Sequence, residues 1–183
     1  MKKGNLAYIL HIPLFSAVIC ILSLISVPTP IPFTLQTLGI FISLMTLGGK
    51  RGTTSTLIYI AIGALGLPVF SCFRGGIGHI MEPSGGYIIG FIPLCLCYLL
   101  CSALIGCSFR KKLVCGAISL IPLYLCGVAW QCLLFTNGTF EEFLSTIATF
   151  VLPFIIPDLV KILVAAMISA KIERFARKRR GNM

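Results

Sequence analysis

The sequence has little charge, and very little of that charge is negative. Of its 183 residues, 11% are charged and 57% are hydrophobic, with five Asp or Glu against fifteen Lys or Arg. Soluble domains carry about 25% charged residues, and a chain of this size that folds in water leaves about a third of its surface exposed. The composition therefore excludes an ordinary soluble domain and predicts that lipid covers much of the apolar surface.

The motifs of the common catalytic chemistries are also missing. The two histidines, His11 and His79, belong to no HExxH or Ser/His/Asp arrangement, and the sequence contains no GxxxxGK[ST] segment. The nine cysteines are odd in number, lie mostly in apolar runs and show no CxxC or Cys/His spacing. We interpret them as small apolar side chains and predict no catalytic centre, no metal site and no cofactor.

Proline, glycine and charged residues divide the apolar sequence into six segments. Each predicts a transmembrane helix, although the second is shorter than the roughly 20 residues that a span normally needs. A shorter helix is tolerated where a cavity or a thinner bilayer lies beside it. We therefore predict an all-α integral membrane protein of one domain, residues 1–183, with six transmembrane helices. Their approximate bounds are 8–27, 34–47, 53–70, 85–107, 113–135 and 154–172.

The basic residues fall at the two termini and on alternate connections between these segments. By the positive-inside rule, this pattern places the N- and C-termini in the cytoplasm. The basic tail is then expected near anionic lipid headgroups and not on nucleic acid. Thirteen of the fifteen basic residues follow the pattern: Lys2, Lys3, Lys50, Arg51, Arg110, Lys111, Lys112, Lys171, Arg174, Arg177, Lys178, Arg179 and Arg180.

Two ionisable residues lie within the last apolar segment. Asp158 and Lys161 are spaced i, i+3 and therefore share one face of the predicted helix. Ionisable side chains at membrane depth are costly and usually face a cavity or a pathway, which makes the pair a candidate binding site. The alternative is an ion pair that only fixes the start of the helix.

A glycine-rich connection between the third and fourth segments is a second candidate. It carries Arg74, whose planar guanidinium suits a carboxylate, and His79 as a possible ligand contact. Gly76 and Gly85 allow the backbone to approach a ligand closely. The alternative is a simple outer turn.

Polar residues also stand at the start of the second segment, on the same predicted side of the membrane. Thr34, Gln36 and Thr37 supply neutral hydrogen-bonding groups there, while Tyr87 and Trp130 are candidates for flat apolar walls. Together with the two sites above, they predict an outward-facing pocket for a small, partly polar molecule.

Three groups of segments resemble a known family. Residues 27–39 (VPTPIPFTLQTLG) resemble the first-loop signature of BioY, the biotin-binding S component of energy-coupling factor (ECF) vitamin transporters. Residues 63–70, 74–78 and 83–91 resemble its middle motif, and residues 152–161 (LPFIIPDLVK) resemble its last. The resemblance implies a six-helix ECF S-component fold in a bacterial cytoplasmic membrane. It also implies high-affinity biotin capture at the outer face and partnership with a transmembrane coupling protein and two cytoplasmic ABC-type ATPases.

The resemblance also suggests roles for the candidate residues. Asp158 would accept hydrogen bonds from the ureido N–H groups, and Lys161 or Arg74 would pair with the carboxylate. Thr34 and Gln36 would supply neutral hydrogen bonds, with Tyr87 and Trp130 packed on the rings. Two residues depart from the family pattern, Glu82 and Ser84 in place of the usual Gly and Thr, and Glu82 is placed to compete for Arg74. The docking face for the coupling protein, usually two alanines four residues apart, corresponds to Ser16, Ala17 and Cys20, which are small enough for close helix packing.

Several alternatives stay open on the sequence alone. The first alternative is that the chain is an S component for another small vitamin, and the second is that it transports biotin without an ATPase module. The third alternative is a membrane enzyme that uses Asp158 and Lys161 as acid and base, and the fourth is a structural protein without a ligand. Ligand competition, a turnover assay and the Asp158→Ala variant distinguish these possibilities.

Overall fold

The computed structural model describes residues 3–27, 33–136 and 139–181, and these residues form a helical bundle. Residues 28–32 of the first motif lie outside the described residues. The α-helices are α1 Lys3–Leu24, α2 Gln36–Leu47, α3 Gly49–Ala64, α4 Ile77–Ile80, α5 Gly85–Ile105, α6 Phe109–Phe135, α7 Phe140–Phe150 and α8 Leu152–Gly181. The 3₁₀ helix η1 spans Ser71–Phe73, and the short strands β1 Ser26–Val27 and β2 Phe33–Thr34 pair antiparallel.

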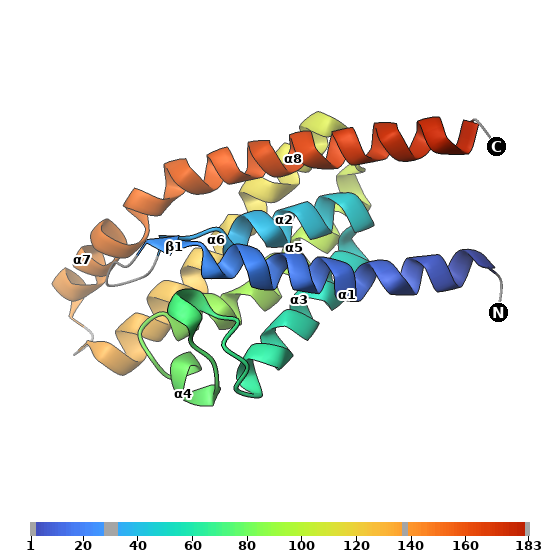
Figure 1. Ribbon diagram of the computed structural model, residues 1–183. Helices are drawn as coiled ribbons and strands as arrows, with labels where there is room; N and C mark the ends of the chain where they lie inside the picture. Colours follow the sequence, from blue (N-terminus) through green and yellow to red (C-terminus); the bar gives the residue numbers. More distant parts are fainter. Residues whose placement is uncertain (1–2, 28–32, 137–138, 182–183) are drawn as a thin grey trace.

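The long helices run side by side, and the short elements collect at one end of the bundle (Figure 1). Helix α1 begins and α8 ends at the opposite end, where the α2–α3 connection also lies. Helix α4, helix α7 and the β1–β2 pair lie at the end away from the two termini. The bundle therefore has one end built from helix termini and tight turns and another built from longer connections.

Helix α2 is short because it is enclosed by other helices. Nine of its twelve residues are buried, and it packs against α1, α3 and α8. Glycine makes the closest of these contacts possible. A Cβ on Gly39 would lie 3.1 Å from Ile19 Cα, and a Cβ on Gly52 would lie 2.5 Å from Leu44 Cα. A helix surrounded by protein in this way does not need the full length of a lipid-exposed span.

The outer surface of the bundle is apolar, as a membrane protein requires. By length and composition, three helical stretches are able to cross a membrane, Gly85–Ile105, Phe109–Phe135 and Glu141–Ala176, and Leu10–Leu24 and Gln36–Leu47 are shorter apolar helices. Large side chains such as Leu100, Leu125 and Ile156 point outward and are more than half exposed. The prediction of an all-helical membrane protein is confirmed at this level.

The third and last helices differ in extent from their predicted segments. Helix α3 begins at Gly49 and ends at Ala64, whereas the sequence pattern predicted residues 53–70. It ends early because Gly66 adopts a left-handed conformation with φ of +103° and Pro68 lacks an N–H to continue the helix. Helix α8 continues to Gly181, about two and a half turns beyond the predicted end at residue 172, because no proline interrupts the basic tail.

Candidate functional site

A pocket opens among α2, α5, α6 and α8 on the side of the bundle that carries the longer connections. It encloses about 570 Å³ of empty space, including its opening to solvent. One part of its wall is polar and the remainder is apolar and aromatic. The lining residues are Thr34, Gln36, Thr37, Ser71, Ser84, Tyr87, Ile88, Phe91, Leu123, Tyr124, Phe150, Phe154, Asp158 and Lys161.

The Asp158 carboxylate is the centre of the polar wall. Its Oδ1 accepts hydrogen bonds from Lys161 Nζ at 2.8 Å and from Thr37 Oγ1 at 2.9 Å. Its Oδ2 accepts a hydrogen bond from the Tyr124 hydroxyl at 2.7 Å. Three helices therefore contribute donors to one carboxylate: α2, α6 and α8. The i, i+3 spacing on α8 brings Asp158 and Lys161 together, but the network extends well beyond that helix.

Both charges are almost completely removed from solvent. Asp158 is 3% exposed and Lys161 is 6% exposed. The ammonium of Lys161 also contacts Thr37 Oγ1 at 3.0 Å and lies 4.2 Å from the centre of the Phe33 ring, a distance suited to a cation–π interaction. A buried ion pair offsets its desolvation cost only with good geometry and extra hydrogen bonds, and this pair has both.

A second polar group lies beside the first. Thr34 Oγ1 donates to Gln36 Oε1 at 2.9 Å, and Gln36 Nε2 donates to the Tyr59 hydroxyl at 2.6 Å. The Tyr59 ring is fully buried and packs edge-on against Phe70. These contacts fix the orientation of the Gln36 amide, so that Thr34 and Gln36 present defined neutral groups to the pocket.

The apolar wall is largely aromatic. The Tyr87 ring packs on Gly127, where a Cβ would lie 2.5 Å from the ring, and its hydroxyl donates to the Phe150 carbonyl at 2.9 Å. This bond ties α5 to the end of α7. Phe91 and Phe154 complete the wall, which offers flat surfaces to an apolar ring or chain.

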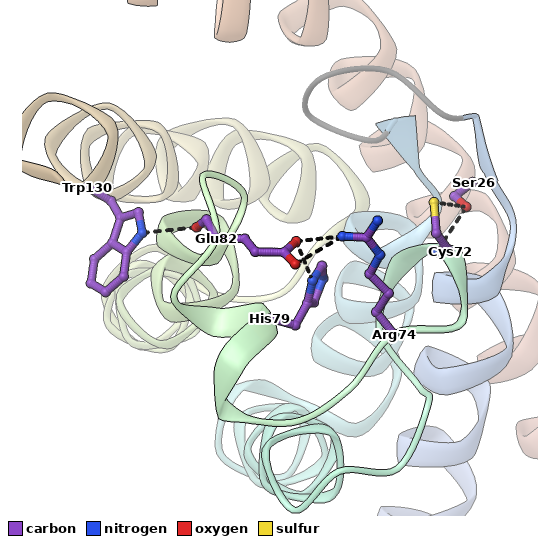
Figure 2. A network of polar contacts seen from close by, with 6 residues as sticks. All are labelled: Ser26, Cys72, Arg74, His79, Glu82 and Trp130. Atoms are coloured by element: carbon purple, nitrogen blue, oxygen red, sulfur yellow. Dashed lines mark hydrogen bonds and ion pairs between the residues drawn. The ribbon is translucent and has the colours of Figure 1, made fainter. Parts of the chain in front are cut away.

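Four of the residues predicted for the site do not line this pocket: Arg74, Gly76, Gly85 and Trp130. Arg74 instead points toward Glu82, with Nη1 2.8 Å from Oε2 (Figure 2). His79 Nδ1 lies 2.9 Å from the same carboxylate, and Trp130 Nε1 donates to the Glu82 carbonyl at 3.2 Å. Glu82 thus contacts three side chains of the region and pairs with Arg74.

The two glycines shape the same connection through the backbone. Gly76 adopts a φ of +88° immediately before α4, a conformation that favours glycine. A Cβ on Gly85 would lie 1.6 Å from the Ile80 carbonyl oxygen, so α5 can begin here only with glycine. Neither glycine lines the pocket.

Three aromatic residues of the pocket had no signal in the sequence: Tyr124, Phe91 and Phe150. They lie in apolar helices, where core packing is the ordinary interpretation. Tyr124 has the most direct role of the three, because its hydroxyl donates to Asp158. Its position 34 residues earlier in the chain can be related to Asp158 only through the packing of α6 against α8.

Comparison with known proteins finds the same family and fold. The BioY family model matches residues 1–178. The chain is 39% identical over 122 residues to "Biotin transporter BioY" of Thermotoga maritima, covering 63% of this chain and 68% of that protein. It is 37% identical over 125 residues to "Probable biotin transporter BioY" of Pyrococcus horikoshii, covering 68% of this chain and 72% of that protein.

A solved structure extends the likeness to the fold. The S-component for biotin from an ECF-type ABC transporter superposes with a TM-score of 0.79 at 24% identity, covering 95% of this chain and 94% of that one. This comparison shows an S-component fold. With a family model that spans nearly the whole sequence, and relatives that match over most of their length, the chain belongs to the BioY family.

Proposed function

We propose that this protein is the biotin-binding subunit of an ECF-type uptake transporter and that it is not an enzyme. The observation that carries the proposal is the buried Asp158–Lys161 pair, joined by Thr37 and Tyr124 at the wall of a pocket. An ion pair that only fixed a helix start would not need donors from two other helices. The names of the relatives supply the substrate.

The pocket suits the chemistry of biotin. The ureido group has two N–H donors and one carbonyl acceptor, and the lone pairs left on Asp158 and the donors of Lys161 meet both needs. The thiophane ring and the valeryl chain match the aromatic wall formed with Tyr87. Thr34 and Gln36 supply neutral hydrogen bonds to the remaining polar atoms.

Charge favours one orientation of the bound vitamin. Asp158 and Lys161 neutralise each other, and Arg74 is held outside the pocket by Glu82. A fully buried carboxylate would therefore bring one uncompensated negative charge into the protein, which is costly. We place the ureido group against Asp158 and the carboxylate at the open side of the pocket, where water remains.

We propose the following topology and location. The chain crosses the membrane six times, through α1, α2, α3, α5, α6 and α8, as a single domain. Both termini lie in the cytoplasm, because the basic residues gather at the end of the bundle where α1 begins and α8 ends. The pocket then faces the outside of a bacterial cytoplasmic membrane.

Partners supply the energy. We propose a transmembrane coupling protein and two ABC-type ATPases, because the sequence has no phosphate-binding loop of its own. Of the three residues expected to dock the coupling protein, Ser16 is turned inward, 2% exposed and bonded to the Ser55 carbonyl at 2.8 Å. Ala17 is exposed, and Cys20 is half-buried. The proposed docking face is therefore centred on Ala17.

Biotin binding by the detergent-purified chain tests the proposal. Titration calorimetry is expected to give saturable binding of biotin and none of riboflavin or thiamine, and Asp158→Asn and Lys161→Ala are expected to abolish it. A folded sample that binds riboflavin or thiamine instead would change the substrate, and one that binds none of the three would refute the binding function. Uptake by the chain alone in vesicles without ATPases would show a stand-alone transporter.

A further inference from the structure

A groove at the opposite end of the bundle from the ligand pocket has the chemistry of a lipid site. It lies between the start of α6 and the second half of α8 and is lined by Phe109, Met167, Ala170, Lys171 and Arg174. Its empty space is about 890 Å³, including the open side. None of these residues lines the pocket proposed for biotin.

The groove has an apolar part and a cationic part. Phe109 and Met167 line it with apolar surface and are 43% and 50% exposed. Lys171 and Arg174 follow at the next turn of α8 and are exposed. Apolar surface that continues into cations along one helix matches the order of an acyl chain and an anionic headgroup at the membrane interface.

The nearby carboxylate does not cancel these cations. Glu173 accepts a hydrogen bond from the buried Lys112 Nζ at 2.5 Å, and Lys112 also contacts Ser169 at 3.0 Å. The Glu173 carboxylate is thus already paired with the buried ammonium of Lys112. Neither Lys171 nor Arg174 forms an ion pair with any residue in the described part of the chain.

The start of α6 adds a second source of positive potential. Ser108 precedes the helix without a side-chain hydrogen bond to the first turn, so the free N–H groups of a 27-residue helix point out at Phe109. Helix N-termini favour phosphate for this reason. The yellow-green start of α6 runs beside α8 at this level (Figure 1).

We propose that this groove binds one anionic phospholipid, with the phosphate between Lys171, Arg174 and the start of α6 and an acyl chain along Phe109, Met167 and Ala170. The lipid would join α6 to α8 at the cytoplasmic end. The site is independent of the transported ligand, so it stands or falls separately from biotin binding.

The test counts retained lipid by native mass spectrometry while the purified chain is titrated with phosphatidylglycerol or phosphatidylcholine. The chain is expected to retain one phosphatidylglycerol and to discriminate against phosphatidylcholine. The double variant Lys171→Gln/Arg174→Gln is expected to lower phosphatidylglycerol affinity about tenfold or more. The matched control Lys50→Gln/Lys178→Gln removes the same charge at the same end of the bundle but outside the groove, and should change affinity less than about twofold.

A second variant tests the apolar part. Ala170→Phe fills the groove without changing charge and is expected to reduce lipid retention while thermal stability and biotin binding persist. Competition by inorganic phosphate should be weak, because free phosphate lacks the acyl chain. Equal losses in both double variants, equal retention of phosphatidylcholine, or full displacement by phosphate would overturn the proposal. Unchanged lipid retention in Lys171→Gln/Arg174→Gln with loss of the coupling protein would assign the groove to that partner instead.

Discussion

The Asp158–Lys161 pair allows ligand binding and structural stability to be separated by paired substitutions. In Lys161→Met, Asp158 keeps its hydrogen bonds from Thr37 and Tyr124 but loses the cation 2.8 Å away. In Asp158→Asn, Lys161 is left as the buried charge. Removing one partner of a buried pair costs about 3–5 kcal/mol, whereas replacing both by neutral groups of similar volume is often close to neutral.

The double variant Asp158→Asn/Lys161→Met is therefore expected to recover most of the stability lost in each single variant. Its melting temperature in detergent should lie near that of the wild type, because the carboxamide still accepts from Tyr124 and Met fills the space of the lysine stem. Biotin binding should stay lost in all three variants, because the ligand requires the charged groups. Thermal unfolding and titration calorimetry on the same samples provide the two readouts.

Two results would refute this reasoning. If the single variants melt at the wild-type temperature, the pair is not a desolvated ion pair of the kind the geometry shows. If the double variant binds biotin with wild-type affinity, the pair serves only to fix α8 against α2 and α6. Recovery of stability without recovery of binding supports both the physical account and the proposed function.

Three further changes test other contacts of the site. Tyr124→Phe removes the 2.7 Å hydrogen bond to the pocket carboxylate, and it should lower biotin affinity about tenfold or more, since a bond to a charged group contributes about 1.5–3 kcal/mol. Arg74→Gln should reduce affinity only a few fold, because the guanidinium already pairs with Glu82 and such exposed pairs contribute at most about 1 kcal/mol. Gly127→Ala should weaken binding and stability together, because its Cβ would lie 2.5 Å from the Tyr87 ring and overpacking costs about 1–3 kcal/mol. Calorimetry and thermal unfolding measure all three.

Matched controls exist for these variants. Tyr98→Phe alters a buried tyrosine that does not line the pocket and should leave affinity unchanged. Gly78→Ala adds a Cβ with nothing within 4 Å, so it should not act like Gly127→Ala. A loss of binding in Arg74→Gln as complete as in Asp158→Asn would show that Arg74 turns into the pocket when biotin binds.

The sequence predicted the fold class well because its signals are local. Long apolar runs and the breaks between them predict helices without knowledge of packing. The end of α3 was harder, because Leu65, Gly66 and Leu67 continue the apolar pattern up to Pro68, and the left-handed conformation of Gly66 is visible only in the structure. The length of α2 was predicted as short, but the reason, its enclosure by α1, α3 and α8, depends on the three-dimensional arrangement.

The site was predicted in part for the same reason. Asp158 and Lys161 stand out because ionisable residues are rare in apolar segments, and Thr34 and Gln36 stand out beside a proline-rich connection. Tyr124 carries no such mark, since an aromatic residue in a membrane helix is ordinarily core or interface. Arg74 stands out in sequence, yet the structure pairs it with Glu82. Local spacing alone does not show which of two nearby groups an arginine will meet.

The distribution of charge connects the fold, the site and the proposed lipid groove. Among the residues that the structure describes, ion pairs join Glu82 to Arg74, Asp158 to Lys161 and Glu173 to Lys112. Each pair is locally neutral, and the pair that is buried on both sides, Asp158 with Lys161, adds no net charge to the low-dielectric interior. The excess of ten positive charges is then carried mainly by the helix ends, where water and anionic headgroups are available. The cost of burying an unpaired charge thus accounts for the neutral ion pair at the pocket. Within the described part of the chain, the exposed Lys171 and Arg174 beside the groove between α6 and α8 form no ion pair.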